Sequence, residues 1–191
     1  MPETYIQDKT YNSADISESA LQTGEYEKCV FNNCNLANTD LSGFKFVDCE
    51  FHGCNLSLAK LNKTGLVDIK FKDCKMLGLR FDTCNEFGLS LSFDNCQLND
   101  SSFYKTKIRK TAFKNSQLQA ADFAECDLTS AVFDNCNLML AVFDRTIIEK
   151  ADFRTSYNYS IDPAINKIKK AKFSISGLPG LLYKYDIEIE S

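Results

Sequence analysis

Nine cysteines and one histidine are the residues of this 191-residue chain best suited to nucleophilic, redox or metal chemistry. The cysteines are spaced by five, twenty or similar numbers of positions, as in Cys29, Cys34 and Cys54. A metal site needs CxxC-type pairs whose thiolates converge, and no such pair is present. The spacing therefore favours small, buried, apolar side chains, and no metal or other cofactor is predicted.

The rest of the chain does not supply an enzyme-like constellation. His52 follows Phe51, and we expect its side chain to point outward, without a nucleophile beside it. No glycine-rich phosphate loop, HExxH or GxSxG motif occurs. We therefore predict that the protein is not an enzyme.

Charge and composition restrict the partners and the location. The net charge of -4 excludes a globally basic nucleic-acid binder, so no direct nucleic-acid partner is predicted. No apolar run approaches the roughly 20 residues that cross a bilayer, so no membrane partner is predicted. The opening "MPETYIQDKTYNSADIS" lacks a signal-peptide pattern. We therefore expect a cytoplasmic protein with one domain, residues 1–191.

Large apolar residues recur every five positions, a period that neither a helix nor a strand has. In "AVFDNCNLMLAVFDRT", Phe133, Leu138 and Phe143 follow this rhythm, and Ala131 and Cys136 stand two positions before the first two. A five-residue unit with one large and one small inward residue can form one side of a square coil. The large positions before the middle of the chain are Ile6, Tyr11, Ile16, Leu21, Tyr26, Phe31, Leu36, Leu41, Phe46, Phe51, Leu56, Leu61, Leu66, Phe71, Met76 and Phe81. The rhythm resumes at Phe93 and runs to Phe153.

Stepping along the chain by four units at a time tests whether four such sides close one turn. The step from Phe81 to Phe93 is longer than two units, which predicts a two-residue insertion in "CNEFGLSLSF". Glu86 and Phe87 are the candidate insertion site, either on the outside or at a bulge, or with Phe87 in the inward place left by the slip. We expect Phe87 to point inward. With this correction one side of the coil consists of phenylalanine alone: Phe31, Phe51, Phe71, Phe93, Phe113, Phe133, Phe153 and Phe173.

These residues resemble the pentapeptide-repeat family, whose loose unit is A(D/N)LXX. Local matches are "SADIS" at 13–17, "ANTDLSG" at 37–43, "AADFAE" at 120–125 and "KADFRT" at 150–155. The resemblance implies an all-β fold, a right-handed quadrilateral β-helix, with its coils over about residues 5–175. In such a coil Cys34 and Cys54 would be neighbours, so an oxidative disulfide is conceivable there, although a cytoplasmic location argues against it.

Two outer surfaces are candidates for binding a partner. Acidic residues are expected to gather on one side as a strip, and the side built on Leu36 to Leu138 carries amides and almost no charge. The low-charge side is compatible with docking or with a plain β-surface. The candidate acidic strip consists of Asp82, Asp122, Glu125, Asp127 and Asp144.

The end of the chain leaves the repeat and predicts a cap. "SGLPGLLYKYDIEIES" suits a short helix near Pro179, followed by an alternating edge strand in "YDIEIE". Residues 176–191 therefore form the predicted C-terminal cap and dimerisation segment, in which two caps meet around a two-fold axis. The candidate dimer contacts are Leu178, Leu181, Leu182, Tyr185, Ile187 and Ile189.

Within the family, the chain is most similar to the Qnr-type quinolone-resistance proteins. The full-length single coil, the mid-chain break and "LPGLLYKYDIEIE" carry this similarity. It implies a dimeric rod that imitates DNA, binds the type II topoisomerases DNA gyrase or topoisomerase IV and modulates quinolone sensitivity. The alternative is a generic interaction scaffold with an unrelated protein partner.

Overall fold

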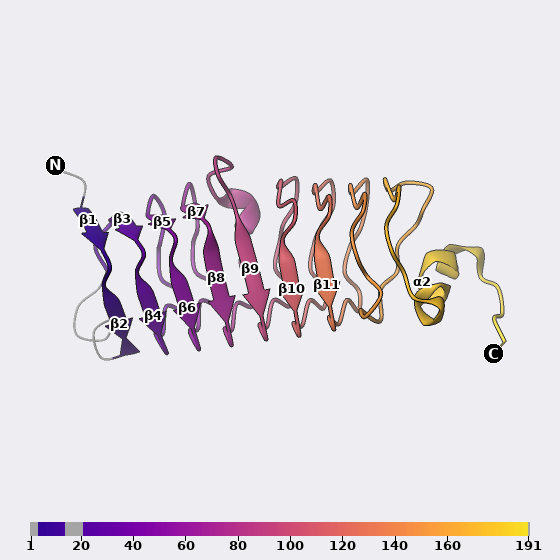
Figure 1. The fold of residues 1–191 in the computed structure, drawn as a ribbon, viewed down its shortest axis with the longest axis horizontal. Coiled ribbons are helices and arrows are strands. Elements are labelled where there is room, and N and C mark those ends of the chain that lie inside the picture. The colour runs from indigo at the N-terminus through magenta and orange to yellow at the C-terminus, as the bar shows by residue number, and fades with distance from the viewer. Residues whose placement is uncertain (1–3, 14–20, 191) are drawn as a thin grey trace.

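The computed structural model describes residues 4–13 and 21–190, which form one elongated rod of stacked coils with a small helical cap at its C-terminal end (Figure 1). Ile16 and most of the "SADIS" match lie outside the described residues. In the described part no helix combines the length and the apolar character that a bilayer crossing requires. The predicted quadrilateral β-helix with a short C-terminal helical cap is confirmed.

Two parallel sheets form two of the four walls of the rod. The phenylalanine wall is the seven-stranded sheet, in the order β11-β10-β9-β8-β6-β4-β2, and the fourth wall begins with the four-stranded sheet β1-β3-β5-β7. The seven strands are β2 (Thr10–Asn12), β4 (Val30–Asn32), β6 (Glu50–His52), β8 (Ile69–Lys72), β9 (Leu91–Asp94), β10 (Ala112–Lys114) and β11 (Val132–Asp134). The four are β1 (Thr4–Gln7), β3 (Gly24–Glu27), β5 (Lys45–Val47) and β7 (Gly65–Val67).

The other two walls are held by single bridges between neighbouring coils. The amide wall, built on Leu36 to Leu138, pairs Asn35 with Asn55 and continues in steps of one coil to the pair Asn137 and Tyr157. The third wall pairs Asp40 with Lys60 and, farther along, Asp122 with Val142. It includes the 3-10 helix η1 (Phe81–Thr83). Beyond β7, bridges from Lys107 to Lys167 continue the fourth wall.

The strand register confirms the four-unit turn and the two-residue insertion. Phe31 pairs with Phe51, and Phe113 pairs with Phe133, so each partner lies four units farther along the chain. The partner of Phe71 is Phe93, and the segment between them contains four units and the insertion. The insertion is therefore absorbed within one turn, and the register continues beyond it.

The interior is filled by ladders of aromatic rings. The eight phenylalanines predicted on one side stack in sequence, with ring centroids from 4.6 Å to 5.5 Å apart. A second ladder, from Phe81 through Phe103 and Phe123 to Phe143, rises along the third wall. The two ladders meet edge to face, as Phe103 and Phe113 do at 5.8 Å and 89°. Such tilted contacts are a favoured aromatic geometry.

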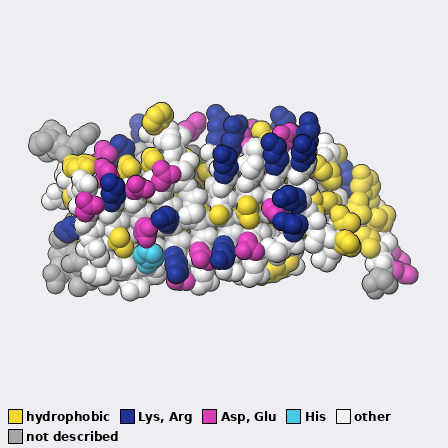
Figure 2. All heavy atoms as spheres, viewed as in Figure 1, with side chains coloured by type: hydrophobic (Ala, Val, Ile, Leu, Met, Phe, Trp, Pro, Cys, Tyr) yellow, Lys and Arg dark blue, Asp and Glu magenta, His cyan; other side chains and the backbone are white. Residues whose placement is uncertain are grey.

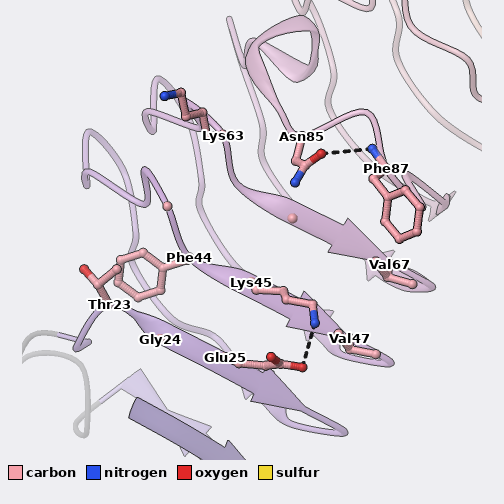
Figure 3. Close-up of a pocket in the computed structure, with 12 residues that line it drawn as sticks. Thr23, Gly24, Glu25, Phe44, Lys45, Val47, Lys63, Val67, Asn85 and Phe87 are labelled. Atoms are coloured by element: carbon pink, nitrogen blue, oxygen red, sulfur yellow. Dashed lines mark hydrogen bonds and ion pairs between the residues drawn. The ribbon is translucent and has the colours of Figure 1, made fainter. Parts of the chain in front are cut away.

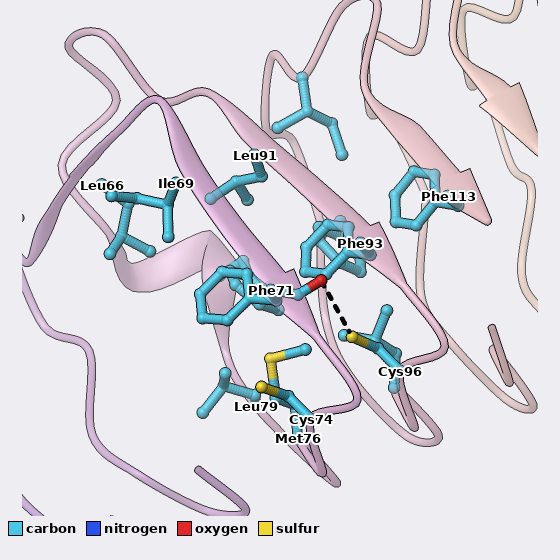
Figure 4. Close-up of a cluster of buried hydrophobic side chains, with 14 of the residues drawn as sticks. Leu66, Ile69, Phe71, Cys74, Met76, Leu79, Leu91, Phe93, Cys96 and Phe113 are labelled. Atoms are coloured by element: carbon cyan, nitrogen blue, oxygen red, sulfur yellow. Dashed lines mark hydrogen bonds between the residues drawn. The ribbon is translucent and has the colours of Figure 1, made fainter. Parts of the chain in front are cut away.

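The small inward residues satisfy backbone groups as well as filling space. The Cys54 thiol donates to the Phe31 carbonyl at 3.3 Å, and the Cys96 thiol donates to the Phe71 carbonyl at 3.4 Å (Figure 4). The Ser101 hydroxyl makes the equivalent bond to Met76 at 2.9 Å. All nine cysteines are free and buried. The prediction of small buried fillers is confirmed, and the structure adds a donor role, because a buried carbonyl needs a partner.

The corners of the coil require a left-handed backbone. The residues that follow the phenylalanine ladder have positive φ, for example 52° at Asn33, 61° at Gly53 and 56° at Asp73. Asparagine, glycine and aspartate adopt this conformation at lower cost than most residues. The predicted role of these residues as turn formers is confirmed.

The cap covers the last coil. It consists of the 3-10 helix η2 (Ile175–Gly177), the helix α2 (Pro179–Leu182) and the 3-10 helix η3 (Tyr183–Tyr185). Pro179 opens the helix, as predicted. The predicted edge strand is wrong, because Asp186–Glu190 form no strand within the single described chain. Asp186 has a φ of 49°, which turns the backbone after η3.

Tyr159 lies beneath the cap with a hydroxyl that has no partner. The residue is 4% exposed. Among the buried side-chain nitrogen and oxygen atoms of residues 4–13 and 21–190, its hydroxyl oxygen is the one that makes no hydrogen bond. A buried hydroxyl without a partner costs about 1–3 kcal/mol. We expect Tyr159→Phe to raise the free energy of unfolding by about 1 kcal/mol. Urea denaturation followed by circular dichroism measures this change, and a loss of stability would contradict the prediction.

Candidate functional site

Six of the nine cysteine thiols inside the rod have a raised pKa, whereas a hydrogen bond with Cys74 lowers the pKa of Cys96. Burial raises the pKa of the Cys126 and Cys136 thiols to about 12, so both stay protonated near neutral pH. The thiolate is the nucleophilic and metal-binding form. Within the described ranges no cluster of three or more metal-binding side chains is found. The outer walls, the insertion and the ends are the candidate surfaces for recognition.

The turn that contains the insertion carries an outward loop, and the expectation that Phe87 fills the core is wrong. Phe87 is 87% exposed, whereas Leu89 is 9% exposed and takes the inward place. The Phe87 amide donates to Asn85 Oδ1 at 3.0 Å, which holds the chain in an outward turn. The Ser90 amide then donates to the Leu66 carbonyl at 3.0 Å and restores the contact with the preceding coil.

Because Phe87 buries little surface, its removal is expected to leave the fold intact. We predict that Phe87→Ser changes the free energy of unfolding by less than about 0.5 kcal/mol, as do most surface substitutions. Thermal unfolding of the variant measures the change. A loss above about 2 kcal/mol, the size expected when a buried aromatic ring is removed, would indicate that the ring is buried in solution.

This loop overhangs a groove on the fourth wall. The groove has a volume of about 510 Å³ and is lined by the backbone of Gly24 and Gly65 and by the side chains of Phe44, Val67 and Phe87, among others (Figure 3). Gly24 and Gly65 add no side chain of their own, and the Lys45 side chain lies beside Gly65. Glu25 and Lys45 form an ion pair at 2.9 Å along the rim. The candidate insertion site, Glu86 and Phe87, therefore borders a partly apolar depression that sequence reasoning missed.

The predicted acidic strip turns a corner and is largely neutralised. Asp82, Asp122, Glu125 and Asp144 belong to the third wall or its corner, whereas Asp127 bridges to Lys107 and Ile147 on the fourth wall. Four of the five carboxylates form ion pairs: Asp82 with Arg80 at 2.6 Å, Asp127 with Arg109 at 2.6 Å, Glu125 with Arg145 at 3.4 Å and Asp144 with Arg145 at 3.2 Å. The strip therefore presents less free negative charge than its residues suggest.

The Asp127 pair predicts a pH-dependent contribution to stability. Burial opposes ionisation of Asp127, but hydrogen bonds from Arg109 at 2.7 Å and from Thr129 at 2.6 Å outweigh it and lower its pKa. A carboxyl whose folded pKa is lowered stabilises the fold above its unfolded pKa, about 3.9. This contribution disappears as the pH falls through the folded pKa.

We therefore expect Asp127→Asn to be less stable than the parent chain at pH 6 and to approach it below pH 4. Urea denaturation across this pH range gives the difference in the free energy of unfolding. A difference that stays constant between pH 6 and pH 3 would contradict the prediction.

The amide wall is a ladder of hydrogen-bonded side chains. The Asn137 amide donates to Gln117 Oε1 at 3.1 Å, and the Asn158 amide donates to Asn137 Oδ1 at 3.0 Å. Three apolar side chains stand out from this wall or its corner. They are Leu58, Met139 and Leu140, with exposed fractions of 61%, 42% and 76%. The wall thus combines low charge with isolated apolar contacts.

The candidate dimer contacts lie on the cap, where apolar side chains gather at the C-terminal end of the rod (Figure 2). Leu181 packs against the core and is only partly available. The other predicted contacts are exposed: Leu178 at 45%, Leu182 at 36%, Tyr185 at 60%, Ile187 at 55% and Ile189 at 52%. Sequence reasoning missed Ile175 and Tyr183, which are 88% and 55% exposed. Ile175 follows Phe173 at the corner position, and that spacing was a usable signal.

Comparison with known proteins agrees with this architecture. A family model described as a pentapeptide repeat region matches residues 24–87 and 86–157. A trypsin-treated form of QnrB1, a plasmid-mediated fluoroquinolone resistance protein, has a TM-score of 0.64 and 16% identity, with 98% of each chain covered. Full-length QnrB1 has a TM-score of 0.53 and 15% identity, with 96% of this chain and 97% of QnrB1 covered. No curated protein matches the sequence. The matched residues and the stacked five-residue units show that this chain belongs to the pentapeptide-repeat family.

Proposed function

We propose that the protein is a non-enzymatic, cytoplasmic, protein-binding rod that engages a type II topoisomerase and modulates quinolone sensitivity. The observation that carries the proposal is the similarity in fold to QnrB1 over 98% of both chains, cap included. QnrB1 is described as a fluoroquinolone resistance protein. A rod of stacked coils has the elongated form that a substitute for duplex DNA needs.

The acidic strip is the proposed contact with the DNA-binding surface of the enzyme. Glu125 and Asp144 are its more accessible ion-paired carboxylates, with side chains 31% and 42% exposed. Both pair with Arg145, whose side chain is 68% exposed, and Glu125 also pairs with Lys105 at 3.6 Å. A partner with a basic surface can take the place of Arg145, because an exposed ion pair is worth only about 0–1 kcal/mol.

A gyrase supercoiling assay tests the proposal. We expect the protein to change the rate of supercoiling and to alter the quinolone concentration that inhibits it. The double variant Glu125→Gln with Asp144→Asn should weaken this effect about tenfold. A matched variant, Asp94→Asn with Asp100→Asn, changes the charge equally on other walls and should retain the effect. No effect of the parent protein on gyrase or topoisomerase IV would overturn the topoisomerase assignment.

The second candidate function is a scaffold for an unrelated protein, and the neutralised acidic strip favours it. On this alternative the amide wall is the docking surface, with Leu58 and Leu140 as apolar contacts. Leu58→Lys with Leu140→Lys should then abolish capture of the partner and leave gyrase unaffected. Retention of the same captured partner by this variant would contradict docking on the amide wall.

We also propose that the rod is a homodimer joined through its caps. The alternating segment after Asp186 has no strand partner within the described chain, and the cap exposes several apolar side chains. Sedimentation should show a dimer that Leu182→Asp with Ile187→Asp converts to a monomer. Leu58→Asp, an exposed apolar site on another wall, should remain dimeric. A parent chain that stays monomeric at high concentration would remove this proposal.

A further inference from the structure

The charges of the chain are unevenly distributed along the rod. Residues 105–172 contain 12 lysine and arginine residues and eight aspartate and glutamate residues, whereas the rest of the chain contains 10 and 18. The net charge of -4 therefore averages a basic segment, residues 105–172, and an acidic remainder. The prediction of no nucleic-acid partner rested on the net charge of the whole chain, which does not exclude nucleic-acid binding by the basic segment.

The excess of positive charge lies largely on the fourth wall. Bridges from Lys107 to Asp127, from Asp127 to Ile147 and from Ile147 to Lys167 place four successive coils in line. Lys/Arg side chains rise in columns along the upper edge of the C-terminal half (Figure 2). We call this surface the basic strip. Its members are Lys107, Arg109, Lys110, Lys150, Lys167, Lys169 and Lys170, all of them exposed.

Most of this charge is not neutralised within the protein. Arg109 is paired with Asp127 at 2.6 Å. The six lysines of the strip form no ion pair within residues 4–13 and 21–190. Besides Asp127, the carboxylate that lies among these lysines is Glu149, which is half-buried. The basic strip thus differs from the acidic strip, whose carboxylates mostly have partners.

The arrangement of these lysines fits a linear, rigid polyanion. Three of them, Lys110, Lys150 and Lys170, occupy the same corner of their coils with φ near 60° and form one straight row. Neighbouring coils are about 4.8 Å apart, so the strip is about 14 Å long. Duplex DNA carries one negative charge per about 1.7 Å of axis, and its phosphates form a continuous, regular target.

We propose that the basic strip binds the phosphate backbone of duplex DNA without sequence preference. The strip lies on the wall opposite the amide wall, so that DNA and a protein on the amide wall can be held at the same time. This inference does not depend on topoisomerase binding, because it concerns lysine side chains outside the acidic strip and a different ligand.

Fluorescence anisotropy with a labelled 24-base-pair duplex tests the proposal on the full chain. If about five lysines replace counterions, the binding constant should fall about 500-fold between 50 mM and 200 mM salt. The strip variant combines Lys107→Gln, Lys110→Gln, Lys150→Gln and Lys170→Gln, and should bind at least about 50-fold more weakly at 50 mM salt. A second duplex of unrelated sequence should bind within about threefold of the first.

The matched control removes the same charge elsewhere. Lys60→Gln, Lys63→Gln, Lys72→Gln and Lys75→Gln together should leave DNA binding within about threefold of the parent chain. Circular dichroism verifies that both variants are folded. Equal weakening by the two variants would overturn the proposal, as would the absence of DNA binding at 50 mM salt. Binding to vesicles of anionic lipid but not to DNA would also overturn it, by assigning the strip to a membrane surface.

Discussion

Replacing Phe113 with alanine is expected to lower the free energy of unfolding by about 3–5 kcal/mol. Phe113 is fully buried in the middle of the phenylalanine wall. Its ring stacks between Phe93 at 5.0 Å and Phe133 at 4.7 Å and meets Phe103 and Phe123 edge to face. The neighbouring rings belong to backbone ladders that cannot collapse around the hole, so most of the cavity cost remains.

Phe173, at the end of the same ladder, is the matched control. It is only partly buried, and its aromatic contacts are Phe153 at 5.4 Å and Tyr159 at 5.8 Å. We expect Phe173→Ala to cost less than half as much, because the last coil can open without the rest of the rod. Urea denaturation followed by circular dichroism measures both variants, since the chain has no tryptophan. Equal losses at the two sites would contradict a rod whose end is less stable than its middle.

Replacing Gly180 with alanine is expected to loosen the cap at a cost of about 1–3 kcal/mol. A Cβ at Gly180 would collide with the Tyr159 carbonyl oxygen and lie 2.9 Å from its ring. The Gly180 carbonyl also accepts a hydrogen bond from the Ile161 amide at 2.9 Å, so a shift of the cap would lengthen this bond. Alanine favours a helix more than glycine does. A loss of stability would therefore come from the clash.

Gly65→Ala is the control for the general effect of adding a methyl group. The Cβ at Gly65 would meet the Lys45 side chain at 3.1 Å, and this flexible chain can move aside. We expect a change below about 1 kcal/mol. Denaturation measures the stability of both variants, and sedimentation shows whether loosening the cap also weakens self-association. If Gly180→Ala is as stable as the parent chain, the described seating of the cap on Tyr159 is wrong.

The coil itself could be predicted because its signal is repeated in every turn. A large apolar residue recurs at the same inward position in each turn, so one atypical residue does not change the assignment of the others. The stacking of Phe31 on Phe51 at 4.6 Å and the pairing of Phe71 with Phe93 follow directly from this count. The corners at Asn33 and Asp73 could be predicted for the same reason.

The single departures from the repeat could not be predicted in the same way. Phe87 and Leu89 are both apolar and both near the inward position. The hydrogen bond from the Phe87 amide to Asn85 holds Phe87 in an outward turn, and Leu89 takes the inward place. Sequence spacing does not contain that bond. The prediction of an edge strand after Asp186 was wrong for a different reason. Alternating apolar and polar residues are typical of a strand, but a strand also needs a neighbouring strand to pair with.

The candidate surfaces were predicted less well than the core because charge depends on pairing along and across coils. The five carboxylates of the acidic strip could be named from the sequence, but their partners could not. Arg80 pairs with Asp82 on the same side of one coil, whereas Arg109 reaches Asp127 from the preceding coil. The basic strip was overlooked because whole-chain charge hides opposite charges in separate regions.

The hydrogen bonds between coils run along the rod, so the axial distance between neighbouring coils is the same throughout. Each additional turn would lengthen the rod by about 4.8 Å and leave the character of the walls unchanged. The pairing of Phe71 with Phe93 shows that extra residues in one turn are accommodated sideways, without a change in axial length. Duplication of whole turns would therefore change the distance between the two ends of the rod. Longer loops would change only its width.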